Sequence, residues 1–425
     1  MAEYDVFTTV DIGSRYTKGA VVSYDGEIYR VLAHAEIESR GIENGDVKDI
    51  ASFKDNMNRL FDELEEQYPK LGKTEFIFSY SSDRYSLESH LERVVLADDE
   101  SEVMITEEML EKIKGDSIKK MSGEGTGYAV YHFYPKRYII NDLRNVFNPV
   151  GMKARSLTME FTAVKIDYPL SEMIKGILDD FIGEEVSLYS SHISSAEGVL
   201  TLTEKDSGVV VVELGHDFTT VVAYLNGIPI NMSVIPVGIK HVIKDVAYVL
   251  GTSYSEAEIL LRNHGSAIIS TQHEDELEIE YRALDGRTIK RVSVEKLSLV
   301  INARLGEIMN KSRRVFKDLE RDVLEYRENG IPGGVVLTGG GAKIRNITEL
   351  ATQVFRTNVR IGTFYRSFPD EEGVEGEEEV IDNPAFASVF GNVVEFIKLI
   401  PEEAGGIKEK GGFLKSLKDF FKNLF

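Results

Sequence analysis

The sequence predicts an α/β protein in which one folding unit, a β-β-β-α segment, is used twice. The main observation is an internal repeat at an offset of 202 residues, from Asp11 to Glu213. Both copies read acid, aliphatic residue, Gly, two polar residues, aromatic residue, Thr, and each copy lies between two β-rich runs. Each copy then reaches another turn, Asp25-Gly26 or Asn226-Gly227, before a helix-like segment. The chain is therefore expected to consist of two related α/β halves.

Length and composition narrow the classes of protein that are possible. The 425 residues exceed one ordinary core and suggest two or three folding units. A net charge of −22 argues against a general affinity for nucleic acid phosphates. No apolar run approaches the ~20 residues of a membrane-spanning helix, and the acidic N-terminus is unlike a signal peptide, so we expect a cytoplasmic protein. The chain has no cysteine, which excludes disulfides, thiolate zinc sites and thiol catalysis.

The repeat sets the expected order of elements. In the first copy, the first two strands are expected at residues 6–10 and 20–23 and the helix at 47–64. In the second copy, the corresponding strands are expected at 209–212 and 221–224 and the helix at 239–250. We expect an inserted subdomain at 82–161, with a helix at 106–121 and a strand at 128–133, and a second one at 231–303, with a helix at 255–263 and strands at 276–283 and 287–294. The first domain then comprises residues 1–81 and 162–198, and the second domain residues 199–230 and 304–400, including a basic helix at 305–326. The acid-rich segment 370–382 is expected to be a solvated loop, and residues 401–412 a flexible linker.

Three glycine turns indicate a site for phosphate groups. Glycine lets several backbone N–H groups converge on a phosphate without obstruction, and Gly13 and Gly215 are also expected to need positive φ. The acids that precede these glycines, Asp11 and Glu213, are placed to hold Mg²⁺ through water. A third turn, Gly339-Gly340-Gly341, follows a β-rich run and precedes a helix expected at 347–355, which suits a ring or ribose. The chain has neither a GxGxxG nor a P-loop fingerprint.

Together these turns resemble the actin/Hsp70/hexokinase superfamily, and within it the chain is similar to the bacterial cell-division FtsA family. Three further stretches carry the resemblance: Asn148-Pro149-Val150-Gly151-Met152, Ile235-Pro236-Val237-Gly238 and Glu256-Ala257-Glu258. The resemblance implies a duplicated ribonuclease H-like actin fold, in which two domains enclose a cleft for ATP and Mg²⁺. It also implies connecting helices at 193–200 and 385–394. The first inserted subdomain would mediate filament contacts, and the second would close over the adenine and dock the FtsZ C-terminal tail.

The resemblance assigns the cofactor-binding residues. They are Asp11, Gly13, Ser14, Arg15, Tyr16, Lys18, Glu213, Gly215, His216, Asp217, Phe218, Gly238, Glu258, Gly339, Gly340, Gly341 and Lys343. The chain departs from the family at His216-Asp217-Phe218, where glycines usually approach the phosphates, and at Leu261, which replaces a lysine and has Arg262 beside it. Glu197 is the one acid of the first connecting helix, so it is either a group that orients water or an ordinary polar helix residue. The expected activity is at most slow ATP hydrolysis.

The FtsZ-binding residues implied by the resemblance are Lys296, Asn302 and Arg304. They lie in the helical stretch that resembles the docking segment of the family, and bases there would attract an acidic tail. The alternative is that all three are solvated residues of an ordinary helix.

Residues 413–425 are expected to form an amphipathic helix that binds the membrane. Seven apolar residues recur at helical spacing over an arc of about 140°: Phe413, Leu414, Leu417, Phe420, Phe421, Leu424 and Phe425. Lys415, Lys418 and Lys422 lie on the remaining surface, which favours anionic lipid. A helix ~20 Å long can lie on a bilayer but cannot cross its ~30 Å core. The alternative is a terminal helix that docks on the protein's own core; the family's C-terminal membrane helix favours the membrane.

The sequence thus predicts an ATP-binding, actin-like cell-division protein that polymerises on the inner face of the cell membrane at the septum. Its partners would be the FtsZ tail, further copies of itself and anionic lipid, and it would anchor the FtsZ ring. Two alternatives remain: an FtsA-like scaffold of pilus assembly, which needs no lipid-binding helix of its own, and a small-molecule kinase of the same superfamily, which needs a catalytic carboxylate at an acceptor pocket.

Overall fold

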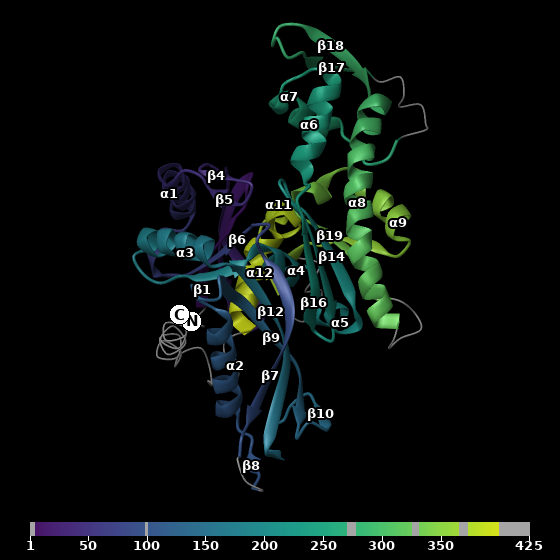
Figure 1. Ribbon diagram of the computed structural model, residues 1–425. Helices are drawn as coiled ribbons and strands as arrows, with labels where there is room; N and C mark the ends of the chain where they lie inside the picture. The colour runs from purple at the N-terminus through teal and green to yellow at the C-terminus, as the bar shows by residue number, and fades with distance from the viewer. Residues whose placement is uncertain (1–4, 98–100, 270–277, 325–330, 365–372, 399–425) are drawn as a thin grey trace.

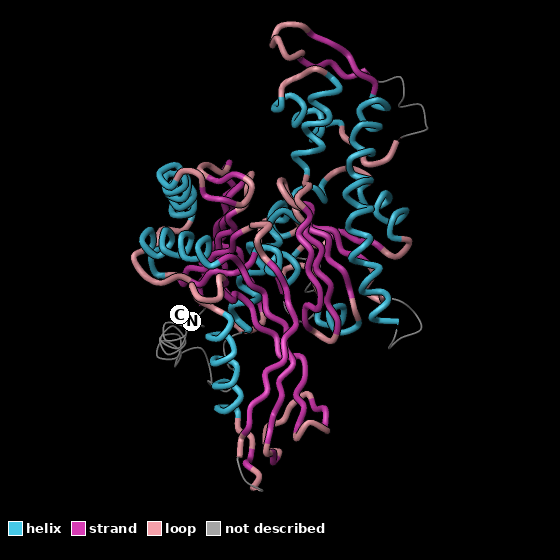
Figure 2. The backbone as a smooth tube through the Cα atoms, in the orientation of Figure 1, coloured by secondary structure: helices cyan, strands magenta, loops and turns pink. Residues whose placement is uncertain are grey.

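Two β-sheets of related topology form the centre of the molecule (Figures 1 and 2). In a computed structural model, residues 5–97, 101–269, 278–324, 331–364 and 373–398 are described. The first sheet has the order β13-β6-β1-β2-β3-β21 and the second the order β16-β15-β14-β19-β20. In both, two antiparallel hairpins join the first three strands, and a fourth strand pairs in parallel with the first. The predicted duplicated actin fold is confirmed.

The strands of the two sheets have the following bounds. The first sheet contains β1 (Asp5–Ile12), β2 (Tyr16–Tyr24), β3 (Ile28–Glu38), β6 (Glu75–Tyr80), β13 (Ser187–Ser190) and β21 (Gly373–Glu375). The second contains β14 (Val209–Leu214), β15 (Thr219–Leu225), β16 (Ile228–Ile235), β19 (Val335–Thr338) and β20 (Val359–Ile361). A short pair, β4 (Ile42–Glu43) and β5 (Asp46–Val47), follows β3.

Helices cover both faces of the first sheet, so residues 7–12 of β1 are buried on both sides. Its side chains alternate: Val10 and Ile12 pack with α1 and α3, whereas Phe7 packs with α12. In the second sheet, Val210 and Val212 pack with α6, α8 and α9. The helices of this layer structure are α1 (Ile50–Gln67), α3 (Tyr168–Ile182), α4 (Ser191–Glu197), α5 (Leu202–Ser207), α6 (Ile239–Leu250), α8 (Val294–Leu324), α9 (Ile347–Phe355) and α12 (Ala387–Lys398), with short 3₁₀ turns η1 (Leu71–Lys73), η3 (Gly340–Lys343) and η4 (Pro384–Phe386).

The two connecting helices, α4 and α12, cross between the sheets in backbone contact. A Cβ atom on Gly391 would lie 1.7 Å from the Ser194 carbonyl oxygen, and one on Gly198 would lie 2.2 Å from the Ala387 carbonyl oxygen. Real Cβ atoms do not approach so closely, so both positions require glycine. The domains therefore meet at a crossing that no side chain separates.

An inserted subdomain extends from the first domain at one end of the molecule (Figure 1). Its sheet has the order β10-β9-β12-β7, and α2 packs on it. The bounds are β7 (Ser86–Val95), β8 (Val103–Met104), α2 (Glu107–Met121), β9 (Tyr128–Ile140), β10 (Arg144–Val146), β11 (Lys153–Ala154) and β12 (Ser156–Asp167). The helix and the strand that the sequence predicts here are confirmed, but β12 continues past residue 161 to Asp167 because it stays paired with β9.

The second insertion lies at the opposite end (Figure 1) and contains α7 (Tyr254–His264), β17 (Glu278–Arg282) and β18 (Ile289–Ser293). The predicted helix and strand pair are confirmed. The boundary expected at residues 303 and 304 falls inside α8, which runs without a break from the insertion into the second domain.

The acid-rich segment is partly ordered against the first domain, contrary to the solvated loop expected from its charge. Gly373–Glu375 forms β21, which pairs with β3, and Glu378–Ile381 forms α11. Val380 and Ile381 are buried in the core beside α12. Glu375, Glu377, Glu378 and Glu379 are exposed, while these two apolar residues hold this part of the segment in place.

The predicted linker and amphipathic helix, residues 401–412 and 413–425, lie outside the described residues. Among the helices that are described, none combines the length and the apolar character needed to cross a bilayer.

The helix crossing predicts that Gly391→Ala destabilises the protein. The added methyl group would meet the Ser194 carbonyl, so the free energy of unfolding in urea should fall by about 1–3 kcal/mol or more. Gly176→Ala in α3 is the matched control, because its Cβ would meet no atom within 4 Å; this variant should gain ~0.5–1 kcal/mol. Equal stabilities of the two variants would contradict the crossing.

Candidate functional site

The two hairpin tips that carry the repeated motif face the space between the domains. The pairing of β1 with β2 sets Asp11 opposite Lys18, and the pairing of β14 with β15 sets Glu213 opposite Thr220. The offset of 202 residues therefore relates the paired positions as well as the motifs. Both acids lie at the end of the central strand of their sheet.

Gly13 and Gly215 do the same structural work in the two hairpins. A Cβ atom on Gly13 would lie 2.8 Å from the Tyr16 carbonyl oxygen, and one on Gly215 would lie 2.8 Å from the Phe218 carbonyl oxygen. Neither glycine has positive φ, so that part of the sequence expectation is wrong. Glycine is needed because the tip curls back onto its own backbone.

Asp11 is almost fully buried at the floor of the site, with 6% of its surface exposed. Its Oδ1 accepts hydrogen bonds from Ser79 Oγ at 3.0 Å and from Ser191 Oγ at 2.6 Å. Ser191 is the first residue of α4. Both bonds go to Oδ1, so among the described residues Oδ2 keeps its lone pairs for a ligand.

His192, the next residue of α4, arranges the second acid. Its Nε2 donates to the Ser82 carbonyl at 2.9 Å, so in the neutral ring Nδ1 accepts from Thr220 Oγ1 at 2.8 Å. Glu213 Oε2 lies 3.3 Å from the same Nδ1. The first turn of α4 thus contacts both strand-end acids.

A cavity of about 410 Å³ lies between the hairpins, the third glycine turn and α7. Of the seventeen residues that the sequence assigned to the cofactor, all except Gly238 line it. Gly238 packs against the second hairpin outside the cavity lining, and a Cβ there would lie 2.4 Å from the His216 carbonyl oxygen. The backbone N–H groups of Ile239 and Lys240 donate to the carbonyl oxygens of Gly215 and His216. Gly238 therefore lets the start of α6 support the second hairpin.

The third glycine turn forms a more apolar part of the lining. Ile239, Ile243, Leu261 and Ile344 lie here. Gly341 is tightly packed, since its Cβ would lie 2.6 Å from Ile239 Cδ1, whereas a Cβ on Gly340 would meet open space. This region can hold a flat ring.

The bulky residues of the second hairpin contact residues of both halves of the molecule. Asp217 accepts from the Asn44 N–H of the β4–β5 turn at 3.1 Å and pairs with Lys240 Nζ at 2.6 Å. Phe218 is buried against Gly45 of the same turn. His216 contacts the Tyr254 hydroxyl at 3.2 Å, and burial lowers the pKa of His216 to about 4, so it is neutral at pH 7. All three residues also line the cavity.

A second link crosses the mouth of the cavity. Arg15 of the first hairpin pairs with Glu258 of α7 at 2.8 Å and also contacts Glu38. Burial opposes the charge of Arg15, but the bonds to Glu258 and Glu38 outweigh it and raise the pKa of Arg15. Arg262 donates to the Tyr16 hydroxyl at 3.2 Å beside this pair. The first domain and the second insertion are therefore held together across the site.

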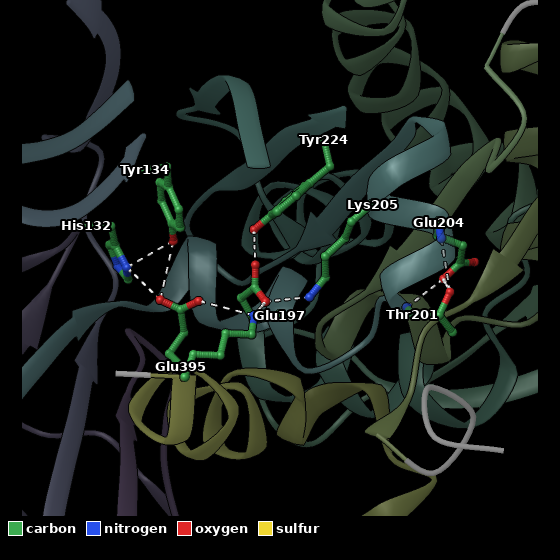
Figure 3. Close-up of polar contacts among 9 residues, drawn as sticks. His132, Tyr134, Glu197, Thr201, Glu204, Lys205, Tyr224 and Glu395 are labelled. Atoms are coloured by element: carbon green, nitrogen blue, oxygen red, sulfur yellow. Dashed lines mark hydrogen bonds and ion pairs between the residues drawn. The ribbon is translucent and has the colours of Figure 1, made fainter. Parts of the chain in front are cut away.

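Glu197 belongs to a buried ion cluster and is not part of the cavity lining, which favours a structural role over the suggestion that it orients water. Its side chain is 2% exposed and accepts from Lys205 Nζ at 2.5 Å, from Tyr224 Oη at 2.9 Å and from Lys398 (Figure 3). Burial favours the neutral acid, but the two ammonium groups outweigh it and hold the pKa of Glu197 well below its usual range. Every oxygen of this carboxylate is occupied, and none faces the cavity lining.

The residues assigned to the FtsZ tail lie on α8 but differ in availability. Lys296 is exposed. Asn302 donates to the Ala267 carbonyl at 2.7 Å, which ties α8 to the preceding loop. Arg304 forms two bonds to Asp245, at 2.6 and 3.1 Å, and contacts Glu307. Of the two charged residues, Arg304 is paired with carboxylates, whereas Lys296 has no ion pair within the described residues.

Sequence reasoning missed the first turn of α4. Ser191 and His192 line the cavity, but the connecting helix was expected to begin at residue 193. The run Ser190-Ser191-His192 was the available signal, because serine is a favoured residue at helix starts. Ala385, Ala387 and Ser388, at the start of the other connecting helix, also line the cavity.

Comparisons with known proteins agree with this geometry. Two family models match the chain: "Cell division protein FtsA" over residues 210–391 and "SHS2 domain inserted in FTSA" over residues 86–165. The second match coincides with the subdomain that begins at β7 and ends at β12.

Curated relatives cover most of the chain. A "Cell division protein FtsA" of Neisseria meningitidis is 31% identical over 300 residues, which cover 68% of this chain and 68% of the relative. The Escherichia coli K12 protein of that name is 26% identical, over 80% of this chain and 79% of the relative. The Bacillus subtilis protein is 23% identical, over 85% and 80%.

Solved structures share the fold at low identity. One is titled "PilM-PilN type IV pilus biogenesis complex", with a TM-score of 0.60 and 14% identity, covering 93% of this chain and 98% of that one. Another is MreB5 of Spiroplasma citri bound to ADP, with a TM-score of 0.52 and 13% identity, covering 93% and 97%.

The ion cluster predicts that Glu197→Gln loses about 3–5 kcal/mol of stability, because two lysines lose their counter-ion. Since the folded-state pKa of Glu197 lies below its ordinary 4.5, its contribution is complete above about pH 4.5 and is lost as the pH falls further. Urea unfolding of both proteins between about pH 7 and pH 3 should therefore show the difference shrinking in acid. A stable variant that has lost ATP hydrolysis would instead support a catalytic role.

Proposed function

Because the chain belongs to the FtsA family of cell division proteins, we propose that it binds ATP between its two domains, polymerises on the cytoplasmic membrane and anchors the FtsZ ring there. The observation that carries the nucleotide part of this proposal is the pair of glycine hairpins, each with a strand-end acid, that face one cavity. Membrane and FtsZ binding rest on the sequence of the tail and of α8.

The residues of the cavity fit a nucleotide and its metal ion. The tight turns at Gly13 and Gly215 turn backbone toward the space for phosphates, and Lys18 and Lys343 line it without a carboxylate partner in the described part of the chain. Asp11 and Glu213 are hard oxygen ligands of the kind that hold Mg²⁺ through water. The apolar surface by the third turn suits adenine. A volume of about 410 Å³ is within the range of small-molecule sites.

ATP would act by favouring the closed arrangement of the domains. Two ion pairs lie beside the cavity. Arg15–Glu258 bridges its two sides, and Asp217–Lys240 holds the second hairpin against α6. A ligand held by both hairpins has more contacts in the closed state, so it shifts the population toward that state. Closed copies would present the surfaces that assemble into a filament, with the inserted subdomain as one contact. With Glu197 engaged elsewhere, the protein acts as a scaffold with at most slow hydrolysis.

The FtsZ tail would dock on the second insertion and α8. Lys296 is exposed there and offers its charge to an acidic peptide. Arg304 would have to exchange Asp245 for the peptide, so it would contribute to specificity more than to affinity. Asn302 supports the surface through Ala267.

The tail, residues 413–425, would supply the membrane anchor. Four phenylalanines and three leucines form its apolar face, and each contributes roughly 1.5–3 kcal/mol when fully buried. A lysine near anionic lipid contributes only ~1 kcal/mol. Insertion of the apolar face therefore dominates, and the lysines set the preference for anionic lipid. This tail favours the cell-division adaptor over the pilus scaffold suggested by fold likeness to PilM.

The nucleotide cleft predicts that Gly13→Val and Gly215→Val each weaken ATP binding at least ~100-fold, because the side chain would collide with the tip's own carbonyl and distort the phosphate turn. Titration with a fluorescent ATP analogue measures the change. Gly26→Val, in the neighbouring turn away from the cavity, is the control for hairpin substitutions; its Cβ meets no atom within 4 Å, although its φ of 103° makes some loss of stability expected. Wild-type affinity in both tip variants would remove the cleft assignment.

The anchoring role predicts that removal of residues 413–425 abolishes recruitment of FtsZ to liposomes while ATP binding persists. Co-sedimentation of FtsZ with anionic liposomes, with and without this protein, tests it. Phe420→Glu with Phe421→Glu should release the protein at any salt concentration, whereas neutralising Lys415, Lys418 and Lys422 should only weaken binding. A truncated protein that still sediments with liposomes when FtsZ is omitted would show that the anchor lies elsewhere.

A further inference from the structure

One buried side chain of the inserted subdomain contacts both connecting helices. His132 of β9 is 2% exposed at its side chain. Its Nε2 accepts the backbone N–H of Ser190 at 3.0 Å, so Nδ1 carries the proton of the neutral ring and donates to Glu395 Oε2 at 2.9 Å. Ser190 immediately precedes α4, and Glu395 belongs to α12. The ring therefore bridges the start of α4 and the end of α12, the two connecting helices about which the domains would move and which we call the hinge.

The contact to Ser190 leads directly to the cavity. The next two residues of α4 are Ser191, which donates to Asp11, and His192, which contacts Thr220 and Glu213. The helix turn that His132 holds is thus hydrogen-bonded to one strand-end acid, Asp11, and lies against the other, Glu213. His132 itself is not part of the cavity lining among the described residues.

The contact to Glu395 leads to the second domain. Tyr134 of β9 also donates to Glu395 Oε2 at 3.3 Å (Figure 3). Lys398 Nζ lies 3.9 Å from Glu395 Oε1 and also donates to Glu197 Oε2. Glu197 is bonded in turn to Lys205 and Tyr224 of the second domain. The inserted subdomain is therefore tied to the same cluster of charges that holds α4, α12 and the second sheet together.

These two hydrogen bonds respond to movement of the hinge. His132 is a rigid ring on a strand, with its donor and acceptor fixed on opposite sides, so it satisfies Ser190 and Glu395 together only at one separation of α4 and α12. A shift of one helix along the other breaks one bond or moves β9. Closely packed helices change by such small discrete shifts.

We infer that His132 is a positioning residue that couples the inserted subdomain to the nucleotide cavity, so that occupancy of the cavity changes the order of that subdomain. The inference rests on the proposed nucleotide function. By linkage, anything that binds the inserted subdomain, a second copy of the chain included, changes nucleotide affinity by the same factor. The coupling is carried by a contiguous set of hydrogen bonds from β9 to Asp11.

Hydrogen exchange of the full chain, with and without saturating ATP, tests the coupling. In the wild type, ATP should change the exchange of amides in β9 and β12 by at least ~5-fold, the lower end of usual allosteric couplings. His132→Phe keeps an aromatic ring, slightly larger than imidazole, and removes both hydrogen bonds, so this response to ATP should be lost. The affinity for ATP should change by less than the coupling factor. His132→Gln keeps a donor and an acceptor and should restore much of the response.

Thr162→Val is the matched control. Thr162 lies in the same subdomain, is equally buried, and donates one hydrogen bond to the Pro229 carbonyl of the second domain at 3.0 Å. This variant removes a different contact of the subdomain and should keep the full response to ATP. If His132→Phe does not fold, Glu395→Met removes the acceptor on α12 and is judged by the same criterion.

The outcomes separate the two proposals. A wild-type protein that binds no nucleotide overturns the proposed function. A wild type that binds nucleotide without a change in β9 and β12, or a His132→Phe variant that responds as the wild type does, overturns the coupling. Loss of the response in Thr162→Val as well would show that any weakening of the subdomain has this effect, which also contradicts a specific role for His132.

Discussion

The structure depends on the backbone contact at which the two connecting helices cross. Gly198 and Gly391 allow α4 and α12 to approach until carbonyl oxygens occupy the space that Cβ atoms would need. This contact sets the relation between the two sheets, and it brings the first turns of both helices to the floor of one cavity. Ser191 and Ser388 reach the cavity for this reason. The hinge of the molecule and the floor of its site are therefore the same piece of backbone.

Close packing of these helices also explains the charges buried beneath them. Glu197 remains ionised in the interior because Lys205 and Lys398 offset the loss of water. Such a cluster tolerates few alternative arrangements, since displacement of one member leaves another charge unpaired. It includes residues from α4, α5 and α12, and through Glu395 it reaches His132 of the inserted subdomain (Figure 3). The cluster therefore favours one arrangement of the two domains, in addition to stabilising the fold.

The second hairpin illustrates how a family pattern can change while its geometry remains. His216, Asp217 and Phe218 are bulky for a hairpin expected to approach a phosphate, and each has a partner in the fold: Tyr254, Asn44 with Lys240, and the packed surface around Gly45. Gly215 is retained at the one position where the tip touches its own carbonyl. These side chains hold the hairpin against both domains. The side chains of His216, Asp217 and Phe218 therefore do not fill the cavity completely.

The sequence by itself determined the duplicated hairpins, most helices and strands, and the amphipathic pattern of residues 413–425, because these depend on local periodicity and turn chemistry. Through the repeated motif and the family resemblance it also identified sixteen residues of the cavity lining, about half of that lining. Tertiary structure alone decided the contacts of Glu197, for which the sequence left open a water-orienting group or an ordinary polar helix residue, and those of Ser191, His192 and Arg304. The partners of Glu197 include Lys398, 201 residues away, and no local pattern records which distant side chains meet. That choice is made by the angle and closeness of helix packing, which act only once the sheets have formed.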